Sequence, residues 1–257
     1  MLFEAALLAA VATAAPAKPD PREMAKSYEV YRDMVERRKI VTTGPAPKLL
    51  APVAAQLAAV GDRLYGAPFH FYVYKSENTN AFVTYGPRVY VDEGLVRFAD
   101  SREELAGVLC HEMNHALHRD GSRDDAASQA YEKRAERIVA AAEKPVRGHF
   151  EQHLEGLAQH GKVFVWMHHT RAEEERADLS GADLCARAGF NPWGMVWMFQ
   201  KLQRTVGNGR LSWFADHPDA KKRIAELKHH FKKFPALFAR WSSNELTATP
   251  LWNGRVQ

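Results

Sequence analysis

The chain has 257 residues, of which 46% are hydrophobic and 26% charged, and its formal net charge is +4. This composition is typical of a globular protein long enough to bury a sizeable core. The sequence shows no internal repeat and no low-complexity block, which excludes a repeat architecture. The small basic excess comes without a nucleic-acid recognition motif, so we expect no nucleic-acid partner.

The first segment, 1–17, is an apolar run rich in alanine and leucine that ends in small residues offering Ala-x-Ala cleavage sites. This pattern predicts a secretory signal peptide, although Glu4 stands where a basic residue is usual. The alternative is an N-terminal helix that packs on the protein or anchors in a membrane. No linker divides the remainder, so we expect residues 18–257 to form a single domain.

The hydrophobic periodicity predicts an α+β protein that is mainly α-helical. In the N-terminal region, 20–66, helices are expected at 20–41 and 49–64. The period then changes to two, which predicts a small sheet over 69–92. Its recognisable strands are 69–74 and 88–92, and we expect the sheet to be mostly antiparallel.

The region 101–234 has the periodicity of successive helices. A capping box formed by Ser101 and Glu104 starts the first of them. Further helices are expected at 124–143, 148–160 and 171–188, and from Asn191 and Pro218 onward. The remaining segment, 235–257, is aromatic and without a clear period, so we expect an irregular C-terminal tail.

Residues 111–115 read His-Glu-Met-Asn-His, in the first helix of that region. His111 and His115 are four residues apart, so their imidazoles project from one helix face and can hold one metal ion. Glu112 is rotated around the helix, where its carboxylate can serve as the base for water at the metal. The apolar positions around the motif have the spacing of a buried helix: Leu105, Val108, Leu109 and Ala116.

A catalytic metal site needs a third protein ligand and an open position. Glu174 and Asp178 are four residues apart on one face of a predicted helix. The first could bind the metal, and the second could accept a hydrogen bond from a ligand histidine. Periodicity does not choose between Glu174 and its neighbours Glu173 and Glu175, and a solvated charged face would explain all three.

Short segments spread over residues 78–224 form a series around this motif. They are, in chain order, Asn80-Ala81-Phe82, Val89-Tyr90-Val91 before Gly94-Leu95, residues 104–109 leading into 111–115, Glu174 to Asp178, Ala188 to Pro192, and His217-Pro218 with Arg223-Ile224. Their order and approximate gaps resemble the HtpX/BepA-type zinc metallopeptidases, relatives of the CAAX prenyl protease.

The resemblance implies a zincin-like metallopeptidase domain whose small sheet packs on the helix of residues 111–115. It implies one zinc ion per chain with Glu174 as the third ligand, and it places Asp178 and Arg223 behind the ligands. His217 would stand beside the metal, where it would either stabilise the oxyanion or bind zinc as an inhibitory latch. A simple helix start at Pro218 would leave His217 without a role.

The implied reaction is endopeptidase hydrolysis of polypeptides, with Glu112 as the catalytic base. We expect an extended substrate to pair with the strand edge around Asn80, Ala81 and Phe82, because backbone pairing recognises peptides with little sequence demand. The sequence lacks the family's polytopic membrane segments, and many members have a longer apolar run and a further histidine where this chain has Ala116 to Asp120. An exported protein, periplasmic or membrane-associated and active in envelope quality control, is therefore expected.

Two other classes of function compete with this interpretation. One is a zinc-binding chaperone or assembly factor with a peptidase-like fold and little turnover, against which the intact Glu112 argues. The other is a different enzyme with this motif, such as an aminopeptidase. In such enzymes the third glutamate usually lies much nearer to the motif than Glu174 does.

The other notable residues have less specific patterns. Cys110 and Cys185 lie in apolar helical patterns, which favours buried free thiols, with a single disulfide as the alternative. A basic run over 221–233 suggests a solvated helix face, or contact with an anionic membrane surface. His149 and His153 repeat the four-residue spacing without a glutamate between them, which is only a weak signal for a second metal site. The remaining histidines, including His118 and His169, are expected to be mostly surface residues. The sequence indicates no oligomeric state.

Overall fold

The computed structural model describes residues 19–121, 169–205 and 220–252. The predicted signal peptide, His149, His153 and His217 lie outside this part of the chain. Within it the helices are α2 (Pro21–Glu36), α3 (Pro45–Tyr65), α4 (Glu93–Phe98), α5 (Arg102–His118), α8 (Arg171–Arg187), α9 (Trp193–Thr205), α11 (Ala220–Lys233) and α12 (Pro235–Phe238). The strands are β1 (Ile40–Val41), β2 (His70–Tyr74), β3 (Ala81–Val83) and β4 (Arg88–Asp92), so the predicted α+β, mainly helical class is confirmed.

The four strands form one mixed sheet in the order β1-β2-β4-β3. Two pairings, β1 with β2 and β3 with β4, are antiparallel, as expected for a mostly antiparallel sheet. The two strands recognised in the sequence, β2 and β4, run parallel to each other. A turn at Gly86 and Pro87 joins β3 to β4. Strand β3 pairs with β4 on one side only and lies at the edge of the sheet.

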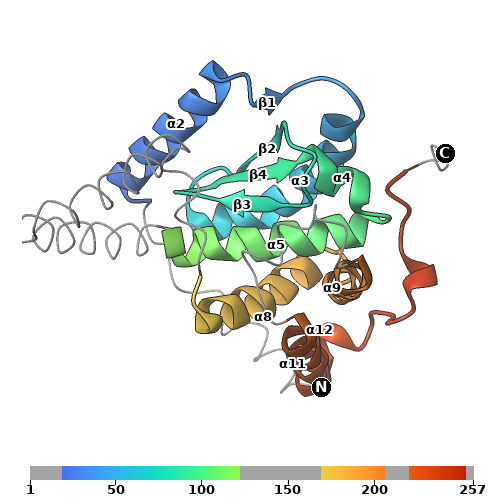
Figure 1. Cartoon of the computed structure of the whole chain (residues 1–257). Coiled ribbons are helices and arrows are strands. Elements are labelled where there is room, and N and C mark those ends of the chain that lie inside the picture. Colours follow the sequence, from blue (N-terminus) through green and yellow to red (C-terminus); the bar gives the residue numbers. More distant parts are fainter. Residues whose placement is uncertain (1–18, 122–168, 206–219, 253–257) are drawn as a thin grey trace, which may run out of the picture.

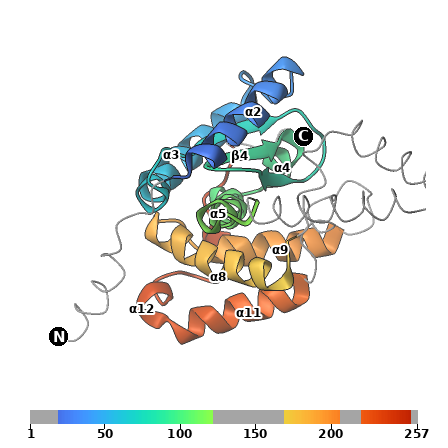
Figure 2. The same cartoon turned by 90° about the vertical axis from the view of Figure 1, so that its left-hand side faces the viewer.

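Helix α5 lies between the sheet and the C-terminal helices α8, α9, α11 and α12. Figure 2 shows the succession α2, the sheet, α5, then α8 and α9, and finally α11 and α12, while α3 packs beside α5 and also contacts α8. The apolar stripe predicted around the His-Glu-x-x-His motif is buried, because Leu105, Val108 and Leu109 are completely inaccessible to solvent. Helix α5, which carries the motif, therefore runs through the middle of the described structure (Figure 1).

The predicted helix over 20–41 is too long by several residues. Helix α2 ends at Glu36, and Arg38 adopts a left-handed conformation with φ 54°. That conformation is unfavourable within a right-handed helix, so the chain turns and Ile40–Val41 joins the sheet as β1. Helix α2 packs on the sheet face turned away from α5, where Met34 meets an aromatic layer containing Phe82 and Tyr90.

The C-terminal segment contains more regular structure than the tail predicted from the sequence. After α12 it forms a short 3-10 helix, Glu245–Thr247, and Pro250 then makes a bridge to Ser101 at the start of α5. Phe238 and Leu251 are buried in the main core. This segment therefore helps to fix the N-terminal end of α5.

Among the described helices, none has both the length and the apolar character needed to cross a bilayer.

Candidate metal centre

Helix α5 brings the two histidines of the motif together. It begins with the predicted capping box, in which Ser101 and Glu104 satisfy each other's backbone groups. Its regular turn places His111 Nε2 3.0 Å from His115 Nε2, and both side chains are fully buried. Two imidazole nitrogens thus converge on one point, as the spacing predicts.

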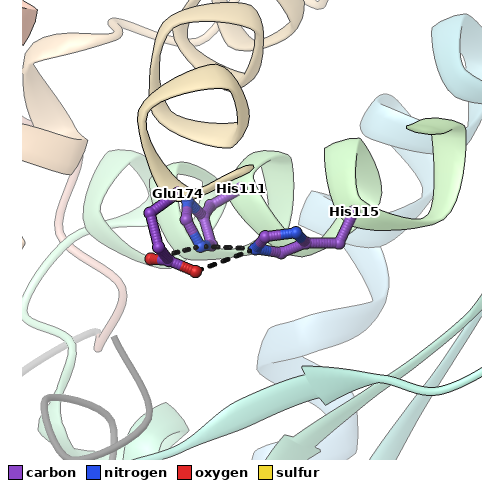
Figure 3. Close-up of side chains that lie close together, drawn as sticks. All are labelled: His111, His115 and Glu174. Carbon is purple, nitrogen blue, oxygen red and sulfur yellow. Dashed lines mark hydrogen bonds and ion pairs between the residues drawn. The ribbon is translucent and has the colours of Figure 1, made fainter. Parts of the chain in front are cut away.

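Helix α8 supplies the acidic group that faces them (Figure 3). Glu174 Oε1 lies 3.4 Å from His115 Nε2, and Glu174 Oε2 lies 3.6 Å from His111 Nε2. Glu173 instead completes a capping box with Thr170 at the start of α8, and Glu175 is exposed. The structure therefore brings Glu174, of the three neighbouring glutamates, to the histidines.

The geometry of these three side chains suits a tetrahedral metal ion. Two ligand atoms bound at about 2.0–2.1 Å to tetrahedral zinc lie roughly 3.3 Å apart, close to the observed separations of 3.0–3.6 Å. His111, His115 and Glu174 form a group whose ligand atoms could hold one ion. Two imidazoles and one carboxylate are a donor set found in catalytic zinc sites. The residues present therefore fit the expected cofactor.

His111 is supported by a buried ion pair. Its Nδ1 lies 2.9 Å from Asp178 Oδ1, and Arg223 on α11 contacts both oxygens of Asp178 at 2.6 Å. Burial alone would raise the pKa of Asp178, but the Arg223 guanidinium outweighs it and holds that pKa below its usual range. Burial lowers the pKa of His111 to about 3, which keeps the imidazole neutral, the form that binds metal.

His115 is supported by Asp120, which the sequence analysis did not identify. Asp120 Oδ2 lies 2.9 Å from His115 Nδ1, and the other oxygen of Asp120 accepts a hydrogen bond from Arg176 on α8 at 2.6 Å. Burial alone would lower the pKa of His115, but hydrogen bonds to Asp120 and Glu174 outweigh it and raise the pKa to about 9. The only sequence signal for Asp120 was an acidic residue five positions after His115.

Two further side chains lie at the site. Glu112 is almost completely buried next to His111, and its negative charge contributes to the raised pKa of His115. His169, expected at the surface, stacks on His115 with ring centroids 3.7 Å apart and an interplanar angle of 11°. A surface histidine and a stacked one look the same in the sequence, so no signal identified His169.

The proposed substrate-binding residues lie in the sheet and not on the helices that carry the metal ligands. Ala81 and Phe82 belong to the edge strand β3, which packs against α5, and Asn80 immediately precedes it. All three side chains are buried, and the Phe82 ring stacks on Tyr90. Only backbone groups of this segment are therefore suitably placed to meet a substrate.

Cys110 and Cys185 form a disulfide, so the favoured interpretation as free thiols is wrong. Their Cα atoms are 5.9 Å apart because α8 packs very closely on α5. A Cβ atom at Gly181 would lie 3.2 Å from the Cys110 backbone. The sequence placed each cysteine in a buried helix face but did not show that the two faces meet. The disulfide joins the two helices directly beside His111.

Comparison with known proteins shows which family the chain resembles. The model for "Peptidase family M48" matches residues 48–230, well over half of the chain. The beta-barrel assembly-enhancing protease of Yersinia pestis is 28% identical over 215 residues, which cover 72% of this chain and 42% of that protein. The metalloprotease LoiP of Escherichia coli strain K12 is 27% identical over 188 residues, covering 73% of each protein.

The metalloprotease YcaL of the same strain is 27% identical over 181 residues, covering 70% of this chain and 68% of that protein. The chain spans only about two fifths of the length of the beta-barrel assembly-enhancing proteases that it matches. These matches confirm the resemblance drawn from the spaced segments. The chain belongs to peptidase family M48.

Proposed function

We propose that this chain is a zinc-dependent endopeptidase in which His111, His115 and Glu174 bind the metal. The observation that carries this proposal is the convergence of two imidazole nitrogens and one carboxylate within 3.0–3.6 Å in a buried site. The family and the protease names of the relatives agree with it. A third ligand on a separate helix is what distinguishes this site from a chance sequence motif.

Glu112 is the general base in this proposal. Zinc bound at the site would lower the pKa of water and polarise the scissile carbonyl. Glu112 would take the proton from that water and deliver it to the leaving amine. Asp178 would fix the orientation of His111, and Arg223 would hold Asp178 while also contacting Glu174 Oε2 at 2.9 Å. Arg223 thus links one ligand to the group that orients another.

We further propose that the substrate adds a strand to β3. Asp92 N donates to Asn80 O at 2.9 Å, and antiparallel pairs alternate, so Phe82 also pairs inward with Tyr90. The backbone groups of Ala81 and Val83 then point to the open edge, where no other described strand pairs. Recognition through backbone groups fits a protease that acts on unfolded or extended segments.

His217 remains part of the proposal from the family resemblance, either as an oxyanion-stabilising group or as a zinc-binding latch. Its position lies outside the described residues. The two roles differ in sign, because replacing a stabilising group lowers turnover whereas replacing a latch raises it. His217→Ala therefore distinguishes them.

The setting that we propose is the cell envelope, where an exported protein with residues 18–257 as a single domain takes part in protein quality control. The names of the bacterial relatives, which include a beta-barrel assembly-enhancing protease, support this setting. Contact with an anionic membrane surface would use the exposed basic side chains of α11: Lys221, Lys222, Lys232 and Lys233. Sedimentation with anionic and zwitterionic vesicles would test that contact.

The proposed function is tested by measuring bound zinc and casein hydrolysis on the same protein samples. We expect wild type to bind one zinc and to cleave casein, and o-phenanthroline to stop cleavage. Glu112→Gln should keep the metal and lose at least about 100-fold in rate, the usual contribution of a general base. Glu174→Gln should lose both metal and activity, whereas Glu175→Gln, its exposed neighbour, should lose neither.

Other outcomes would change the assignment. If zinc binds but neither wild type nor His217→Ala cleaves casein or other unfolded proteins, the endopeptidase proposal is wrong and the chaperone alternative gains support. If wild type binds no zinc, the metal site itself is wrong.

A further inference from the structure

The turn that follows α5 brings the acidic side chain of Asp120 back to the candidate metal centre. Arg119 adopts a left-handed conformation with φ 57°, which ends the helix and turns the chain back. As a result Asp120, only five residues after His115, reaches the Nδ1 atom of that ring at 2.9 Å. Asp120 is completely buried, so this contact is shielded from water.

A second helix holds the other side of this carboxylate. Arg176 donates from Nη2 to Asp120 Oδ1 at 2.6 Å, and Arg176 belongs to α8, the helix that carries Glu174. The two oxygens of Asp120 are thus held by groups from two helices. The arrangement repeats the order histidine, aspartate, arginine that His111 forms with Asp178 and Arg223.

The turn that carries Asp120 has little room to move. A Cβ atom added to Gly121 would lie only 1.9 Å from the backbone oxygen of Thr84, the residue after β3. The turn is therefore packed directly against the end of the edge strand. Asp120 is fixed through its backbone on one side and through Arg176 on the other.

The chemistry of imidazole gives this contact a function. A histidine that donates from Nδ1 to a carboxylate has its neutral tautomer fixed, and Nε2 is then left with a lone pair for the metal. His115 Nε2 is the atom that faces Glu174 and His111. Fixing the ring at Nδ1 therefore aims Nε2 at the proposed metal position.

A second metal site is the main alternative use of these groups. His115, Asp120 and His169 are near enough to one another to hold an ion. However, that site would need the Nδ1 atom of His115, which already contacts Asp120, and Asp120 is paired with the Arg176 cation. A bound cation would have to displace this pair, so the contacts favour orientation of His115 over a second ion.

We propose that Asp120 and Arg176 are positioning residues that orient His115 and thereby set the zinc affinity of the site. This inference rests on the proposed function, because it requires zinc at His111, His115 and Glu174. Neither Asp120 nor Arg176 touches the metal in this proposal. Their effect passes entirely through His115.

The test is the dissociation constant for zinc, measured by competition with a chromophoric chelator, together with the thermal stability of the metal-free proteins. Asp120→Asn should weaken zinc binding by about 10–100-fold, the usual effect of losing such a partner. Arg176→Gln should weaken it by a smaller factor, and Arg176→Lys should restore part of the loss. Arg187→Gln, an exposed arginine on the same helix, is the matched control and should not change the affinity.

The outcomes separate the inference from the proposed function. If wild type binds zinc and the Asp120 and Arg176 variants bind it equally well, the positioning role is wrong and the contacts only stabilise the fold. Arg176 is partly exposed, so its variants keep the test valid even if Asp120→Asn does not fold. If wild type binds no zinc, the metal site fails and the inference fails with it.

Discussion

The two histidines of the candidate metal centre have the same kind of support in two different environments. Behind His111, both Asp178 and Arg223 are almost completely buried. Behind His115, Asp120 is buried, but the side chain of Arg176 is 30% exposed. A buried ion pair is costly to break, whereas a pair that reaches solvent is screened. We therefore expect the groups behind His111 mainly to stabilise the fold, and the groups behind His115 mainly to set the zinc affinity.

The largest effect should follow from breaking the buried pair. Asp178→Asn removes the charge that pairs with the buried Arg223 through two contacts and leaves the contact with Glu174, and we expect the metal-free protein to lose about 3–5 kcal/mol of unfolding free energy. Asp120→Asn should cost about 1–3 kcal/mol, because Arg176 can turn to water. Urea unfolding measures both losses, with Asp183→Asn, a partly exposed aspartate on α8, as the control. Equal losses at Asp178 and Asp120 would contradict the difference between the two sides.

The disulfide should contribute nearly as much on the His111 side. It closes a loop of 75 residues between α5 and α8, and such crosslinks typically contribute about 2–4 kcal/mol. Urea unfolding of wild type with and without a reductant should show this loss. The double variant Cys110→Ala and Cys185→Ala should be insensitive to the reductant. No change on reducing wild type would show that the crosslink is not part of the folded protein.

Two glycines allow the sides to be compared by packing alone. Gly121→Ala, on the His115 side, would bring Cβ to 1.9 Å from the Thr84 oxygen, so the turn must shift, at a cost of about 1–3 kcal/mol. Gly181→Ala, on the His111 side, would bring Cβ only to 3.2 Å from the Cys110 backbone, and we expect the smaller loss. Thermal unfolding measures both. Gly121→Ala should also weaken zinc binding, and a normal zinc affinity in that variant would contradict a fixed turn.

The smallest effect concerns the stability of the metal-free protein in acid. His115 and Arg176 lower the pKa of Asp120 against the opposing effect of burial, and Arg223 does the same for Asp178. Because both folded-state pKa values lie below the unfolded value, their contribution is fully present above about pH 4 and is lost as pH falls further. Unfolding free energy measured between about pH 5 and pH 2 should fall less steeply in Asp178→Asn than in wild type. An unchanged slope would contradict the lowered pKa of Asp178.

The sequence could predict the parts of the site that depend on one helix. The spacing of His111 and His115 determines that both face one way, and the structure shows this convergence. Glu173 could also have been set aside from the sequence, because a threonine followed three residues later by a glutamate predicts that Glu173 serves as a cap, although this signal does not choose between Glu174 and Glu175. The prediction from periodicity alone overlooked that signal.

The remaining features depend on contacts between elements. Asp120 reaches His115 only because Arg119 adopts a left-handed conformation, which the amino-acid sequence around it does not predict. Cys110 and Cys185 pair because α5 and α8 meet, a tertiary fact that helical spacing cannot reveal. Strand β1 is two residues long, too short for a period, and its apolar residues had extended the predicted helix.

The central claim is that α5 and α8 together build a zinc centre from two imidazoles and one carboxylate. X-ray absorption at the zinc edge of the purified wild-type protein tests it most directly. The account predicts nitrogen and oxygen ligands at about 2.0–2.2 Å with a contribution from two imidazoles, and the loss of bound zinc in His115→Ala. A sulfur shell near 2.3 Å, or a spectrum that does not change in His115→Ala, would contradict it.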